Sequence, residues 1–151
     1  MIVYHGGYRV IEAPAIRAGK NNKDFGDGFY CTNLRAQADQ WAKRFDTPVV
    51  SVYEYTPSAA LAVLKFDTMT DEWLDFIVDC RSGKPHGHAI VEGAMANDQV
   101  WNYIADFANG VLTREQFWVL AKFKRPTHQL AFCSPAALSC LTHLESYEAK
   151  T

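Results

Sequence analysis

The stretch DFGDGFYCT at residues 24–32 constrains this sequence more than any other. Its two glycines, Gly26 and Gly28, precede an aromatic pair, so the backbone is free to turn tightly before it becomes extended. Glycines before an aromatic strand let a planar ligand approach the backbone, and an exposed Tyr30 ring offers that ligand a face for stacking. The same spacing is typical of a hairpin or loop in which Tyr30 is an ordinary core residue. The residues alone leave both interpretations open.

A helix is predicted over residues 33–45, directly after this stretch. Thr32 or Asn33 is placed to cap its first turn. Its apolar residues recur at helical spacing. They are Leu34, Ala38, Trp41 and Phe45. The region thus predicts a turn, a strand and a helix in succession.

The rest of the chain mixes extended and helical patterns. Strands are expected at residues 2–5, 48–55, 61–66, 88–93 and 128–133. Gly6 and Gly7 would end the first of these strands and leave His5 at the end of a sheet. The run at 88–93 is expected to be a central buried strand. The mixture predicts an α+β fold in one domain, residues 1–148, without repeats or linkers.

Four further helices are expected. Thr70 and Ser134 are typical N-cap residues, and Thr113 with Gln116 has the spacing of a capping box. The second of the four, about ten residues long, ends at Gly110. The inward-facing residues are Trp73, Ile77 and Cys80 in the first, Phe117 and Leu120 in the third, and Leu138, Leu141 and Leu144 in the last.

Composition narrows the function classes. The chain has 151 residues, is 48% hydrophobic and carries a formal net charge of -2, so it is globular and its total charge indicates no nucleic-acid surface. A local basic face remains open as an alternative. Its members would be Lys43, Arg44, Lys122, Lys124 and Arg125.

The cysteines and the amino terminus indicate the compartment. Cys31, Cys80, Cys133 and Cys140 form no CxxC pair and lie in apolar surroundings, which favours buried free thiols in a reducing environment. The start of the chain does not resemble a signal peptide, and no apolar run approaches the roughly 20 residues that span a bilayer. A cytoplasmic protein without membrane contact or bound metal is therefore expected.

Three motifs occur in a fixed order: His5-Gly6-Gly7, the GxGFYxT pattern ending at Thr32, and Gln129 on a late strand. This order resembles the H-Y-E/Q arrangement of the ADP-ribosyltransferase superfamily, which includes poly(ADP-ribose) polymerases and diphtheria-toxin-like enzymes. In particular, the chain resembles a bacterial family of unknown-function domains in that clan, with a YHG start, a DFGxGFYxT signature and a terminal Gln-bearing strand. The likeness runs from Tyr4 to about Leu144. It implies a split, mainly antiparallel β-sandwich with surrounding helices.

The resemblance also implies roles toward NAD, the substrate. His5 would hydrogen-bond a ribose hydroxyl on the adenosine side, the Gly6 backbone would hold the nicotinamide amide, and Tyr30 would stack on the nicotinamide ring. Trp41 would close the other side of the ring, although it equally fits the core stripe of its helix. Gly7, Gly28, Phe29 and Thr32 of the same motifs are included among the NAD-binding residues.

Gln129 stands where the superfamily's polymerases have Glu. Cleavage of the nicotinamide–ribose bond builds positive charge on the ribose, and a Glu would stabilise that charge and bind the 2′-hydroxyl. An amide can accept the hydroxyl's hydrogen bond but cannot act as a general base. Chain-forming polymerase activity is therefore disfavoured, which leaves mono-transfer or plain NAD binding. The base would then come from elsewhere: Asp98 first, then Asp24, Asp27 and Glu92, although each also fits a capping or turn role.

A second departure is Gly7, where polymerase-type members have Ser or Thr. The lost hydrogen bond is worth about 0.5 to 1.5 kcal/mol, which would weaken NAD binding several-fold. Lys23 and Arg44 are candidates to meet the pyrophosphate, or else are ordinary surface charges.

The sequence thus predicts an NAD-dependent mono-ADP-ribosyltransferase, with His5, Tyr30, Gln129 and Asp98 as its catalytic residues. It would be a toxin-like or phage-defence effector that modifies a protein or a nucleic acid. Since several members of the bacterial family are encoded beside small antitoxins, an antitoxin protein is a further expected partner. Two alternatives stay open: a catalytically degenerate NAD-binding or partner-binding module, and an aromatic protein interface around Tyr30 and Trp41.

Overall fold

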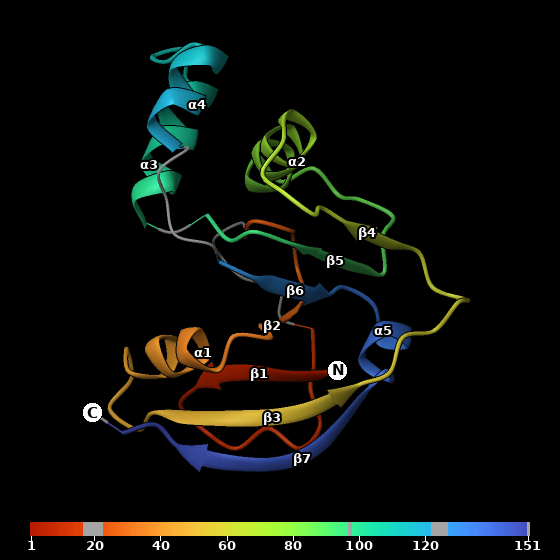
Figure 1. Cartoon of the computed structure of the whole chain (residues 1–151). Helices are drawn as coiled ribbons and strands as arrows, with labels where there is room; N and C mark the ends of the chain where they lie inside the picture. The colour runs from red at the N-terminus through yellow and green to blue at the C-terminus, as the bar shows by residue number, and fades with distance from the viewer. Residues whose placement is uncertain (17–22, 97, 122–126, 151) are drawn as a thin grey trace.

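The computed structural model describes residues 1–16, 23–96, 98–121 and 127–150, and this part of the chain forms a mixed α+β fold (Figure 1). Its strands are β1 (Ile2–Gly7), β2 (Phe29–Cys31), β3 (Val49–Tyr55), β4 (Val63–Lys65), β5 (Ile90–Gly93), β6 (Gln129–Phe132) and β7 (Leu141–Glu148). Its helices are α1 (Arg35–Ala42), α2 (Asp71–Arg81), α3 (Asp98–Ala108), α4 (Arg114–Ala121) and α5 (Pro135–Leu138).

The strands form two sheets. One is antiparallel, with the order β1-β3-β7, and the other has the order β2-β6-β5-β4, in which β4 and β5 are parallel. A single bridge joins β1 to the end of β2: Tyr4 N donates to Thr32 O at 2.8 Å, and Thr32 N donates to Tyr4 O at 2.9 Å. The mainly antiparallel two-sheet arrangement confirms the coarse α+β prediction.

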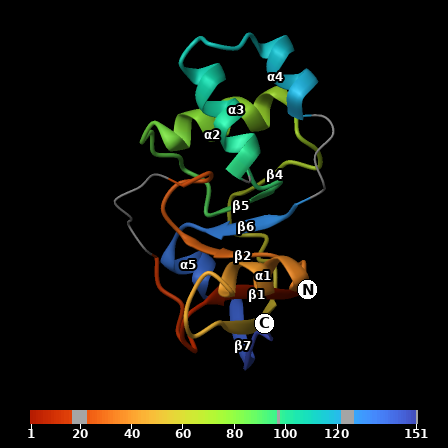
Figure 2. The same ribbon diagram turned by 90° about the vertical axis from the view of Figure 1, so that its left-hand side faces the viewer.

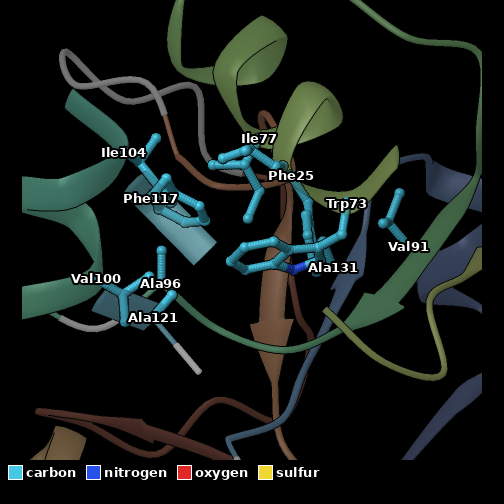
Figure 3. Close-up of a cluster of buried hydrophobic side chains, with 11 residues drawn as sticks. Phe25, Trp73, Ile77, Val91, Ala96, Val100, Ile104, Phe117, Ala121 and Ala131 are labelled. Atoms are coloured by element: carbon cyan, nitrogen blue, oxygen red, sulfur yellow. The ribbon is translucent and has the colours of Figure 1, made fainter. Parts of the chain in front are cut away.

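The four-stranded sheet lies between the helices α2, α3 and α4 on one side and the three-stranded sheet on the other (Figure 2). Apolar side chains fill the space on both of its faces. On the face toward the three-stranded sheet, a cluster includes Val3, Phe29, Tyr53, Leu130 and Phe132. On the opposite face, α2, α3 and α4 supply most of a second cluster, centred on Phe25 and Trp73 (Figure 3). The helix α1 packs separately on the three-stranded sheet, through Ala38 and Ala42 against Val50.

The predicted caps at Thr70, Thr113 and Ser134 are confirmed. Thr70 Oγ1 accepts from Trp73 N at 3.2 Å, and Ser134 Oγ accepts from Ala137 N at 3.1 Å. The capping box closes in both directions, because Thr113 Oγ1 accepts from Gln116 N and Gln116 Oε1 accepts from Thr113 N, at 3.1 and 2.9 Å. Short side chains at these positions replace the missing partners of the first turn, which is why sequence alone locates them.

Three expectations about the first strand and first helix are wrong. Gly6 and Gly7 do not end β1 but pair with Val50 and Val49, so His5 lies within the strand, opposite Ser51. The N-cap of α1 is Leu34, without a side-chain cap, because Thr32 Oγ1 instead accepts from Leu34 N one residue before the helix. The predicted apolar stripe is also shorter. Leu34 and Phe45 are exposed, and Ala38 and Ala42 are the buried residues of α1.

The prediction of a long last helix is also wrong. The helix α5 ends at Leu138, and Leu141 begins β7, which runs antiparallel to β3 as far as Glu148. Leucines three residues apart suit a helix, but burial alternates along residues 141–144, and pairing with the open edge of β3 decides the structure. In α4, Phe117 is buried as predicted, whereas Leu120 is exposed and not inward-facing.

The other predicted strands and the helix from Thr70 are confirmed, with Trp73, Ile77 and Cys80 all buried in α2. All four cysteines are free thiols, as predicted. Among the described residues, none of the helices has the length and apolar character needed to cross a membrane.

Candidate functional site

The strand β2 brings His5 and Tyr30 together. His5 Nδ1 donates to the carbonyl oxygen of Tyr30 at 2.6 Å, and the His5 ring stacks on Phe29 with centroids 4.3 Å apart. Because a carbonyl can only accept, Nδ1 carries a proton, and Nε2 is an acceptor whenever the ring is neutral. In that form His5 has the tautomer that can accept a hydrogen bond from a ligand hydroxyl.

Tyr30 is held by the turn that precedes it. Its hydroxyl donates to Gly26 O at 2.7 Å and accepts from Phe25 N at 2.9 Å. Burial raises the pKa of this hydroxyl well above its usual range, so it stays protonated at neutral pH. The Lys23 ammonium lies 6.0 Å from the ring centroid, over the ring, so a cation already faces it.

Gln129 and Asp24 form a second group of contacts, on the helix-covered face of the four-stranded sheet. Gln129 Nε2 donates to Asp24 Oδ2 at 3.0 Å, and both side chains are buried. Asp24 is also paired with the guanidinium of Arg81, whose Nε lies 2.8 Å from Oδ1, and it accepts from Ala96 N at 2.9 Å. The carboxylate predicted as a reserve base is thus neutralised by Arg81.

His128 and Glu92 form a pair toward the opposite face. Asn33 N donates to His128 Nδ1 at 2.9 Å, so the ring proton lies on Nε2 and is donated to Glu92 Oε2 at 2.7 Å. This bond holds the pKa of Glu92 below its usual range. Glu92, another reserve base, is therefore occupied by His128.

The sheet register divides the predicted catalytic residues between two faces. Tyr30 pairs with Ala131, two residues after Gln129, so the side chains of Tyr30 and Gln129 project from the same face. The His5 ring instead lies against Phe29, which belongs to the cluster between the sheets. The structure thus brings His5 to the backbone of Tyr30, and Gln129 to its side-chain face.

Two of the predicted NAD-binding glycines, Gly6 and Gly28, have packing reasons of their own, whereas Gly7 has room for a side chain. A Cβ at Gly6 would clash with Ala38 O and lie 2.9 Å from Trp41 Cβ, so Gly6 lets α1 approach β1. A Cβ at Gly28 would lie 2.9 Å from Phe132 O. A Cβ at Gly7 would lie 3.4 Å from His5 Nε2, so a side chain there would contact the ring.

The remaining candidates are scattered. Trp41 is half-buried on α1 beside Gly6, and Thr32 is buried at the bridge between the sheets. Asp27, Lys23 and Arg44 are exposed. The side chain of Asp98, and Lys122, Lys124 and Arg125 of the predicted basic face, lie outside the described part of the chain.

Sequence reasoning missed Arg81 and His128. Arg81 lies in the last turn of α2, where a basic residue is common at any helix end, and its partner Asp24 is 57 residues away. His128 directly precedes Gln129, but nothing in the sequence indicates its pairing with Glu92. In the described ranges, no group of three or more His, Cys, Asp or Glu side chains is arranged to hold a metal ion.

The family model described as "Protein of unknown function (DUF3990)" matches residues 1–143. The match covers most of the chain, which therefore belongs to this family. Searches of the curated proteins and of the solved structures found no match.

Proposed function

We propose that the protein is an NAD-dependent mono-ADP-ribosyltransferase of the cytoplasm, in which the two sheets form the split β-sandwich of that superfamily. The single observation that carries the proposal is the setting of Tyr30: an aromatic ring fixed by two hydrogen bonds, with a cation over it. The nicotinamide ring of NAD is itself a cation, so a ring that attracts Lys23 also suits nicotinamide. Lys23 is exposed, so in this proposal its side chain moves into solvent when a ligand stacks on the ring.

His5 supports the proposal through its tautomer. Since Nδ1 donates to Tyr30 O, Nε2 is an acceptor that suits a ribose hydroxyl. The same bond ties the His5 ring to β2, so the two ligand-binding groups keep a fixed spacing. Such preorganisation orients the ribose for loss of nicotinamide.

Gln129 favours transfer of a single ADP-ribose to a protein or nucleic acid over chain formation. Its amide offers a dipole and an acceptor, but no charge to the developing cation. The carboxylates of Asp24 and Glu92 are engaged by Arg81 and His128, so deprotonation of the acceptor falls to Asp98, to Asp27 or to the acceptor's own surroundings. A toxin-like or defence role, opposed by a small antitoxin, is the biological setting that we infer.

A degenerate NAD-binding or partner-binding module is the second candidate. The observation that favours it is the burial of Gln129, which is only 4% exposed and donates to Asp24. In such a module NAD would bind without turnover.

NAD titration by calorimetry or ligand-detected NMR tests the proposal on the native protein and on three variants. Tyr30→Ala should lose binding, whereas Tyr30→Phe keeps the ring and should retain it. Tyr103→Ala, which removes a tyrosine on α3 bonded to Gln99, is the matched control and should bind as the native protein does. Absence of binding by the native protein at millimolar NAD would refute the proposal.

Growth on induced expression separates the enzyme from the module. If the protein modifies a cellular acceptor, expression should be toxic and His5→Ala should relieve the toxicity while the protein remains folded. Toxicity that is unaffected by His5→Ala, in a protein that binds NAD, would favour the module.

A further inference from the structure

The Asp24 carboxylate, on the helix-covered face of the four-stranded sheet, accepts hydrogen bonds from three other residues. It is 5% exposed, and the groups that donate to it come from three elements of the fold. They are Arg81 of α2 through Nε and Nη2, Ala96 N after β5, and Gln129 Nε2 of β6. Arg81 supplies the counter-charge, so Asp24 and Arg81 form an ion pair in this buried position.

This contact fixes which end of the Gln129 amide faces Asp24. An ionised carboxylate has no proton to donate, so the amide must present its NH₂ group to Asp24 and turn Oε1 the other way. The reversed amide would place Oε1 against the carboxylate, which is repulsive. Asp24 therefore decides the donor and acceptor pattern of Gln129.

The acceptor end of Gln129 is left for another group. In the described part of the chain, Gln129 Oε1 accepts no hydrogen bond, and no buried side-chain oxygen there lacks a partner. Oε1 thus keeps contact with solvent, on the same face of the sheet as the Tyr30 side chain. A ligand that reaches Tyr30 from this face meets an acceptor with a fixed direction.

We propose that Asp24 is a positioning residue that sets Gln129 to accept a hydrogen bond from a ligand hydroxyl. The inference rests on the proposed function, in which the donor is the 2′-hydroxyl of the nicotinamide ribose. Asp24 and Arg81 act through Gln129 and do not touch the ligand themselves. The arrangement also excludes a ligand that presents an acceptor at this point.

The test compares NAD with an analogue that lacks the 2′-hydroxyl of the nicotinamide ribose. Loss of one hydrogen bond should weaken binding to the native protein about two- to tenfold. In Asp24→Asn, the side-chain amide of Gln129 is no longer confined to one orientation. The ratio of the dissociation constants of the analogue and of NAD should therefore fall close to one. A merely structural role for Asp24 would weaken both ligands equally and leave the preference unchanged.

The matched control is Asp79→Asn. Asp79 lies on the same helix as Arg81, and its carboxylate pairs with the exposed Lys84 at 3.4 Å. The chemical change is identical, but the site is on the surface. This variant should show the native preference.

The outcomes separate the two ideas. If the native protein binds neither compound, the proposed function fails and the inference fails with it. If the native protein prefers NAD and folded Asp24→Asn keeps the same preference, the inference alone is overturned.

Two measurements cover the case in which Asp24→Asn does not fold because Arg81 has lost its carboxylate partner and keeps only its contact with Trp101 and its other neighbours. In the double variant Asp24→Asn/Gln129→Glu, residue 24 becomes the hydrogen-bond donor and residue 129 the acceptor, and the total charge is kept. This variant should therefore fold and bind NAD more tightly than the analogue. Gln129→Glu alone would instead set two carboxylates side by side. In the native protein, NAD should shift the side-chain amide signals of Gln129 more than the analogue does. Equal shifts would overturn the inference.

Discussion

The two faces of the four-stranded sheet are both buried, yet they are built differently. The face toward the three-stranded sheet carries mainly apolar side chains such as Phe29, Leu130 and Phe132, with His5 stacked on Phe29 and the Glu92–His128 pair at its margin. The helix-covered face is apolar around Phe25 and Trp73 but also encloses Asp24 and Gln129. We expect packing on the first face to stabilise the fold, and the polar groups on the second face to position a ligand. Apart from His5, which lies on the first face, mutations on the two faces should therefore separate loss of stability from loss of ligand binding.

The largest effect is expected for Phe132→Ala on the apolar face. Phe132 is fully buried and contacts Tyr55 edge to face, so truncation should lower the free energy of unfolding by about 3–5 kcal/mol. The discrimination between NAD and its analogue should persist in the folded fraction. Urea unfolding measures the loss, with Leu144→Ala, at a side chain 52% exposed, as the control. A loss below about 1 kcal/mol would show that this face is loosely packed.

Tyr30→Phe removes a hydroxyl from the other face and keeps the ring. The N–H of Phe25 and the carbonyl of Gly26 lose their partner, so the free energy of unfolding should fall by about 1–3 kcal/mol. NAD affinity should change little, because the face of the ring survives. A large loss of affinity with unchanged stability would reverse the roles assigned to the ring and the hydroxyl.

The Glu92–His128 pair, at the margin of the apolar face, should make the stability of the protein depend on pH. The pKa of Glu92 is lowered in the folded protein, so its contribution is complete above the unfolded pKa of about 4.3 and is lost as the pH falls through the folded pKa. The unfolding free energy of the native protein should therefore fall on acidification below about pH 5 by roughly 1.5 kcal/mol more than that of Glu92→Gln. Parallel curves for the two proteins would contradict this assignment.

The smallest effect is expected at the start of α2. Thr70→Ala removes the acceptor of Trp73 N and should cost about 1 kcal/mol of stability. Because α2 carries Arg81 at its other end, the preference of the site for NAD over the analogue should be unchanged. Thermal unfolding and the same binding ratio test both statements. Thr70→Ser, which keeps the hydroxyl, is the conservative control.

Local signals in the sequence predicted most of the elements but few of the contacts between them. Thr70, Thr113 and Ser134 were identified because a cap depends on residues within one turn. The strand β7 was missed because its pairing with β3 joins residues far apart in the chain, and Leu141 and Leu144 fit a helix equally well. The sequence also identified Gln129 and Tyr30, but the role of Asp24 depends on Arg81 and on a contact across 105 residues. No local pattern encodes such a contact.

The order of the strands has a consequence for how the chain folds. Along the chain, β1 belongs to the three-stranded sheet, β2 to the four-stranded sheet and β3 again to the three-stranded sheet. The strands β4 to β6 then complete the four-stranded sheet, and β7 completes the three-stranded one. Neither sheet is a continuous segment, so no cut in the chain separates one sheet from the other. Long-range pairing of this kind slows folding. While residues 141–148 are still inside the ribosome, β3 has β1 on one side and lacks β7 on the other. We therefore expect the three-stranded sheet to be completed only after synthesis has passed residue 148.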